Sequence, residues 1–149
     1  MKFEEVVFTQ KYYKHKPTFL PTRANNRSAG YDFYLKNDVT IKPGQTVFQQ
    51  TDVKCKLSLD EVLLLFIRSS IGIKQHLVLA NGTGVIDADY YGNEDNDGNI
   101  GLALYNYGTE PVTLKEGTRV MQGVVVDYQI AENDNAMGNR SGGFGSTGR

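Results

Sequence analysis

The chain has 149 residues, the usual size of one domain with its own hydrophobic core. Its content of 40% hydrophobic and 22% charged residues is ordinary for a globular protein and excludes a disordered chain. The formal net charge of −1 argues against a general nucleic-acid binder, which needs a basic surface to displace counterions from phosphates.

Neither the N-terminal stretch nor the longest apolar run looks like a targeting or membrane segment. The N-terminal stretch MKFEEVVF carries charge where a signal peptide needs an apolar run, and residues 62–67 are too few to cross a bilayer. The one cysteine, Cys55, cannot form an intrachain disulfide, and we expect it in the core. These features predict a cytoplasmic protein that does not bind membranes.

The first half of the chain reads as short strands. The basic stretch KYYKHK at residues 11–16 is expected to be a solvated strand edge, where lysines discourage pairing. Residues 38–59 alternate apolar and polar side chains around a KPG turn, which is typical of strands. Residues 61–70, EVLLLFIRSS, are short and apolar, which favours a buried strand over a helix.

Strand signals continue to about Ala131. Two strands are expected in residues 76–93 and 100–108, with the polar run NEDNDGN between them as a hairpin. Residues 111–130 predict another pair around a turn at Glu116 and Gly117. Because helix signals are weak, the sequence predicts an all-β sandwich or jelly roll.

The composition changes after Ala131. Residues 132–149 are polar and rich in glycine, so we expect a mobile C-terminal arm beyond a domain of residues 1–131. A single aromatic residue, Phe144, stands amid Gly and Ser, and the backbone N–H groups of this stretch could cradle phosphate oxygens.

Five stretches, in this order, resemble the trimeric dUTP diphosphatases (dUTPases). They are AGYDF at 29–33, RSSIGIK at 68–74, NGTGVIDADYYG at 81–92, GTRVMQGVVV at 117–126 and GGFGSTG at 142–148. The resemblance extends over nearly the whole chain. It implies a jelly-roll homotrimer that hydrolyses dUTP to dUMP and pyrophosphate with Mg²⁺, and active sites built by motifs from different subunits.

The third stretch contains two carboxylates, Asp87 and Asp89, which would share one face of a strand and repel each other unless the chain turns there. The resemblance implies that Asp87 orients and deprotonates the attacking water, and that Asp89 has a structural role. It also implies that Tyr90 packs on the deoxyribose and excludes a 2′-hydroxyl, that Asn81 hydrogen-bonds the uracil edge, and that Gly84 allows close approach of the backbone.

The resemblance assigns phosphate binding to residues from several motifs. These are Arg68, Ser69, Ser70 and Gln122, and in the arm Arg140, Gly143, Ser146 and Thr147, while Phe144 would stack on the uracil. Asp32 would organise the Mg²⁺-bound triphosphate through water, and Arg119 would support Asp32.

The chain departs from the family pattern at several positions. Ile67 and Ser70 stand where proline and glycine are usual, and Arg140 lies one position beyond the usual tail arginine. About six residues are inserted at Glu94–Asn99. Residues 93–100, NEDNDGNI, match the opening of a calcium loop, but Leu104 takes the place of its final glutamate, so we expect an exposed acidic hairpin tip.

Two other functions stay open on sequence. The dCTP deaminases share this fold, but Ala103 occupies the place of their catalytic glutamate. The second is a nucleotide-sensing regulatory protein, whose protein partner would bind the arm and the inserted loop.

Overall fold

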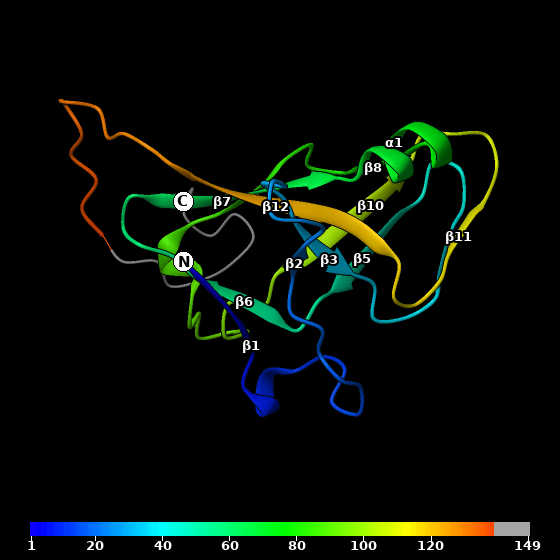
Figure 1. The fold of residues 1–149 in the computed structure, drawn as a ribbon, viewed down its shortest axis with the longest axis horizontal. Coiled ribbons are helices and arrows are strands. Elements are labelled where there is room, and N and C mark those ends of the chain that lie inside the picture. Colours follow the sequence, from blue (N-terminus) through cyan, green and yellow to red (C-terminus); the bar gives the residue numbers. More distant parts are fainter. Residues whose placement is uncertain (139–149) are drawn as a thin grey trace.

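The computed structural model of the chain describes residues 1–138, which form twelve strands in four antiparallel sheets (Figure 1). This mostly β architecture confirms the predicted fold class. No helix within the described residues is long and apolar enough to cross a membrane.

The largest sheet has five strands and is organised around β12, the longest strand, which pairs with both β3 and β7 (Figure 1). Its order is β2 (Thr22–Arg23), β3 (Tyr31–Tyr34), β12 (Arg119–Asp127), β7 (Glu61–Ile67) and β9 (Gly84–Ile86). The apolar run of EVLLLFI is thus a strand, as predicted, and it lies next to the centre of the sheet.

The remaining strands form three smaller sheets. Strand β10 (Gly101–Asn106) pairs with β5 (Thr46–Gln50) and with β8 (Leu77–Leu79). Two further pairs join β1 (Lys2–Glu5) to β6 (Val53–Lys56), and β4 (Val39–Ile41) to β11 (Val112–Leu114). The buried side chains between the sheets include Phe33, Leu35, Ile41, Leu63, Leu65, Leu77, Leu104, Val120 and Met121.

The two faces of the largest sheet differ because successive side chains of a strand point to opposite sides. Leu63 and Leu65 are buried in the core, whereas Phe66 is 37% exposed. Register places further apolar residues on the same side as Phe66. We call this set the outer apolar face: Val62, Leu64, Phe66, Val85, Val124 and Val126.

Cys55 is buried in β6, as predicted. Burial raises the pKa of the Cys55 thiol to about 12. The thiol is therefore protonated at neutral pH and is a poor nucleophile.

Three local predictions are wrong. Residues 69–75 form a short helix, α1 (Ser69–Gln75), which closes at His76 in the left-handed conformation. Strands β9 and β10 do not pair with each other; β9 pairs with β7, and β10 pairs with β8 and β5. The turn at Gly117 joins two strands that belong to different sheets.

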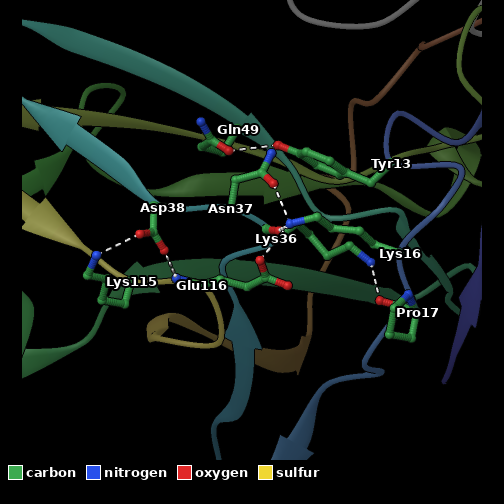
Figure 2. Close-up of polar contacts among 9 residues, drawn as sticks. All are labelled: Tyr13, Lys16, Pro17, Lys36, Asn37, Asp38, Gln49, Lys115 and Glu116. Atoms are coloured by element: carbon green, nitrogen blue, oxygen red, sulfur yellow. Dashed lines mark hydrogen bonds and ion pairs between the residues drawn. The ribbon is translucent and has the colours of Figure 1, made fainter.

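The basic stretch at residues 11–16 is not a strand edge either. Lys16 forms a 2.5 Å ion pair with Glu116, and the Tyr13 hydroxyl donates to Gln49 Oε1 at 2.7 Å (Figure 2). The stretch is tied to the body of the domain by these side chains, a result that its composition could not reveal.

The inserted loop is not an exposed hairpin tip. Asn99 is 1% exposed, and the Asp97 carboxylate accepts the Val7 N–H and pairs with Lys54 Nζ, both at 2.7 Å. Only Glu94 and Asp95 of the inserted residues are fully exposed. The acidic run is folded inward because its side chains find backbone and lysine donors there.

Candidate active site

A buried carboxylate, Asp32, lies between two arginines on the largest sheet. Its Oδ1 is 3.2 Å from Arg68 Nε, and its Oδ2 is 3.2 Å from Arg119 Nη1. The Asp32 side chain is 6% exposed, whereas that of Arg68 is 27% exposed. Because Asp32 contacts Arg68 at Nε, it fixes the guanidinium while the terminal nitrogens of the fork can face another anion.

Strand register adds a polar amide to this cluster. Gln122 on β12 is paired with Asp32 on one side and with Phe66 on the other. A Cβ atom at Gly30 would lie 2.5 Å from Gln122 Oε1, so only glycine leaves that amide in place. These residues border a cavity of ≈ 370 Å³, the charged cavity, lined by Ala24, Ser28, Ala29, Gly30, Asp32, Phe66, Arg68, Gln122 and Val124.

Sequence reasoning missed Ser28 and Gly30 as lining residues. The available signal was their position beside Asp32, in and just before the AGYDF stretch. Ser69 and Ser70, which were predicted as phosphate ligands, begin α1 directly after Arg68 and are exposed.

A second cavity, of ≈ 390 Å³, contains Asn81 and Gly84. We call it the apolar cavity; its lining is Phe48, Leu65, Leu79, Ala80, Asn81, Gly84, Gly101, Leu102, Ala103 and Met121. A Cβ atom at Gly84 would lie 3.0 Å from Leu65 Cβ, so a larger residue would fit only if Leu65 moved by a few tenths of an ångström. Ala103 contributes only a methyl group, so no acid or base stands at that point of the wall.

The two cavities open on opposite faces of the same strand pair. Leu65 and Met121 line the apolar cavity, and their chain neighbours Phe66 and Gln122 line the charged cavity. Since neighbouring side chains in a strand point to opposite faces, the backbone of β7 and β12 separates the cavities. One ligand cannot pass through the sheet to fill both cavities of one chain.

Asp87 lies where β9 gives way to a 3₁₀ turn. Its backbone is extended (φ −80°, ψ 158°), and the turn η2 (Ala88–Tyr90) begins at the next residue. Asp87 and Asp89 are both exposed, and the turn removes the alternation that would place them on one face of a strand. Tyr90 is buried, at 5% exposure.

The structure therefore places most of the predicted residues in two groups, and it places Asp87 and Asp89 in the exposed turn after β9. Asp32, Arg68, Arg119 and Gln122 form the first group, and Asn81 and Gly84 the second. The predicted arm residues lie outside the described part of the chain: Arg140, Gly143, Phe144, Ser146 and Thr147.

The residues of the charged cavity suit a metal ion whose other ligands are water molecules and substrate phosphates. Within residues 1–138, no three His, Cys, Asp or Glu side chains lie close enough to hold a metal by themselves. Asp32 has two arginine contacts, but a carboxylate offers about four lone-pair positions, so it can still accept from metal-bound waters. Mg²⁺ keeps several waters and bridges phosphates, which matches so sparse a protein contribution.

Comparison with known proteins gives consistent results. The family model described as dUTPase matches residues 16–148. A deoxyuridine 5′-triphosphate nucleotidohydrolase of Lactococcus lactis is 40% identical over 138 residues, covering 91% of this chain and 92% of that protein. The human mitochondrial enzyme of the same name is 36% identical over 134 residues, covering 87% of this chain and 50% of that protein.

Solved structures agree with the sequence matches. The crystal structure of a dUTPase from Streptococcus mutans has a TM-score of 0.78 and 36% identity, and the match covers 89% of this chain and 100% of that chain. A dUTPase from a Staphylococcus aureus phage, phi11, described with a structural Mg(II) ion, shares the fold at a TM-score of 0.70 and 22% identity. The chain belongs to the dUTPase family.

Proposed function

We propose that this chain hydrolyses dUTP to dUMP and pyrophosphate, with Asp87 as the general base that takes a proton from the attacking water. The observation that carries this role is the exposed carboxylate directly after β9, the strand whose Gly84 borders the apolar cavity. A well-placed general base contributes about 10²–10⁴ to the rate.

The apolar cavity is the proposed uracil site. Asn81 offers both a donor and an acceptor to the edge of the base. A hydrophobic pocket alone separates uracil from thymine by only about 1–3 kcal/mol, because the two differ by one methyl group. The close contact between Gly84 and Leu65 keeps the backbone rigid at this wall, which supports steric rejection of that methyl group.

The charged cavity is the proposed triphosphate site. Arg68, held by Asp32, would bind phosphate oxygens together with Ser69, Ser70 and Gln122. The arm would complete the site with Arg140, Gly143, Ser146 and Thr147 on the phosphates and Phe144 on the uracil. A Mg²⁺ ion bound to the triphosphate would neutralise its charge, and Asp32 would hold water ligands of that ion.

The separation of the two cavities supports a homotrimer. A nucleotide whose base fills the apolar cavity of one chain needs phosphate ligands from elsewhere, and a neighbouring chain can supply them. The outer apolar face, where Val85 is 57% exposed, borders the charged cavity through Phe66 and Val124 and is a suitable contact surface for that neighbour.

Replacing Asp87 by asparagine tests the catalytic role. We expect Asp87→Asn to lower kcat by about 10²–10⁴ while the protein still binds the non-hydrolysable α,β-imido analogue of dUTP. Pyrophosphate release is measured with dUTP, dCTP and dTTP in the presence of Mg²⁺, and ammonia is measured in parallel. Full turnover by Asp87→Asn contradicts the role, and ammonia from dCTP indicates a deaminase instead.

A further inference from the structure

Tyr90 is held by the loop that follows it, residues 92–99. The Tyr90 hydroxyl donates to the Asn99 carbonyl oxygen at 3.0 Å and accepts from Asn96 Nδ2 at 2.7 Å. The Tyr90 carbonyl oxygen accepts the Asn93 N–H at 3.2 Å. The loop therefore binds both the phenol and the backbone of this tyrosine.

The other side of the same loop is fixed to the start of β6. Asn99 Nδ2 donates to Asp52 Oδ1 at 3.0 Å, and Asn99 Oδ1 accepts the Asp52 N–H at 2.9 Å. Asp52 is completely buried and Asn99 is 1% exposed. Since buried polar groups that lose their partners are costly, the loop cannot shift against β6 without a large loss of stability.

We propose that Asn96 and Asn99 are positioning residues that make Tyr90 rigid, and that the inserted loop thereby strengthens discrimination between dUTP and UTP. The inference rests on the proposed dUTPase function and on the contact of Tyr90 with the deoxyribose that the family resemblance implies. A side chain excludes a 2′-hydroxyl only if it cannot yield, because a wall that moves by about 1 Å makes room for one more oxygen atom. The phenol, bound from two sides, cannot yield in this way.

Two substitutions remove hydrogen bonds of the Tyr90 hydroxyl and keep the aromatic ring. Tyr90→Phe deletes only the hydroxyl. Asn96→Ser keeps a side-chain oxygen that can accept the Gly98 N–H, as Asn96 Oδ1 does at 3.0 Å, but lacks the amide that donates to Tyr90.

Asn93→Ser is the matched control. Asn93 Oδ1 accepts the N–H of Asp95, two residues further on, at 3.1 Å, so serine can preserve this turn as well. The Asn93 side chain is engaged in that turn, and its contact with Tyr90 is made by the backbone, which the substitution leaves unchanged.

The measured quantity is the ratio of kcat/KM for dUTP to kcat/KM for UTP, together with the ratio of Kd values for their α,β-imido analogues. We expect Tyr90→Phe and Asn96→Ser each to weaken both forms of discrimination about tenfold, mainly through better acceptance of UTP. The double variant should be no worse than Tyr90→Phe alone, because deleting the hydroxyl already breaks the hydrogen bond from Asn96 that Asn96→Ser removes. Asn93→Ser should match the wild type.

The proposal is overturned if Tyr90→Phe and Asn96→Ser discriminate between dUTP and UTP as well as the wild type does. It is also overturned if Asn93→Ser loses as much discrimination as they do, or if the losses of the two single variants add in the double variant. Thermal melting of each variant separates loss of discrimination from loss of folding. The analogues are not hydrolysed, so their Kd ratio is measurable even if Asp87 is not the base. Failure of this inference and failure of the catalytic role therefore give different results.

Discussion

Asp32 is a buried side chain whose two oxygens face two different arginines. The sequence identified Asp32, Arg68 and Arg119 through separate motifs, 87 residues apart at the extremes. What the sequence could not show is the geometry, in which Arg68 is contacted at Nε. That detail supports a role for Asp32 in orienting the arginine, in addition to its proposed contact with metal-bound water.

Replacing Asp32 by asparagine should weaken catalysis through Arg68. Charge-assisted hydrogen bonds contribute about 1.5–3 kcal/mol, so loss of the fixed orientation should lower kcat/KM for dUTP by about 10–100-fold. Most of the effect should appear in KM, because the proposed base is untouched. Steady-state kinetics at saturating Mg²⁺ checks this expectation.

Asp38→Asn is the control for that change. Asp38 also faces a cation, since Lys115 Nζ lies 2.7 Å from its Oδ2, but this pair is exposed (Figure 2). Neither residue lines the charged cavity. Exposed ion pairs contribute little, so turnover should equal that of the wild type. Equal kinetic losses in both variants, or none in Asp32→Asn, would contradict the assigned role.

The strands were largely predictable, whereas their partners were not. Alternation and β-branched residues locate β5 and β6 in the sequence, and a short apolar run locates β7, because those patterns are local. The choice of β8 as the partner of β10 depends on contacts between segments distant in the chain. The helix α1 was missed because SSIGIKQ contains weak helix formers, and burial of Ile71 supplies part of its stability.

The conformation of the inserted loop, Glu94–Asn99, was also not predictable from local sequence patterns. Its acidic composition predicted an exposed tip, but Asp97 and Asn99 find buried partners that only the folded chain supplies. One residue within the loop, Gly98, adopts a positive φ of 78°, and a Cβ atom there would lie 2.5 Å from the Tyr90 carbonyl oxygen.

Gly98→Ala should therefore destabilise the domain more than an ordinary turn glycine would. Gly44 is the matched position, since its φ is 72° and no atom lies within 4 Å of the added Cβ. Gly44→Ala should cost about 1–2 kcal/mol through backbone strain alone. Gly98→Ala should cost about 1–3 kcal/mol more, through steric overlap with the backbone of Tyr90.

Urea unfolding of both variants at one protein concentration measures these two costs. Equal losses of unfolding free energy would show that the loop relaxes around the new methyl group. The close packing of the loop on Tyr90 would then not be a source of rigidity.

At the scale of the whole molecule, the apolar cavity and the charged cavity lie on opposite faces of β7 and β12. The family resemblance anticipated active sites shared between subunits, but the sequence alone gave no physical reason for sharing. The alternation of Leu65 with Phe66 and of Met121 with Gln122 supplies that reason. In the proposed trimer, a complete site would combine the base pocket of one chain with the phosphate ligands of another.

The assembled protein should have about three times the chain mass of 16.6 kDa, as measured by sedimentation equilibrium. The composition of the site can be tested with two variants expected to be inactive: Asp87→Asn, altered at the exposed turn after β9, and Arg68→Ala, altered at the charged cavity. The two proteins are unfolded, mixed in equal amounts and refolded together, and dUTP hydrolysis by the mixture is compared with that of each variant refolded alone.

If Asp87 and Arg68 of different chains meet at one site, random assortment should leave about a quarter of the sites with both native residues, and the mixture should regain about that fraction of the wild-type kcat. If both residues of one site come from the same chain, every site carries one substitution. A mixture no more active than its components would thus contradict the shared site.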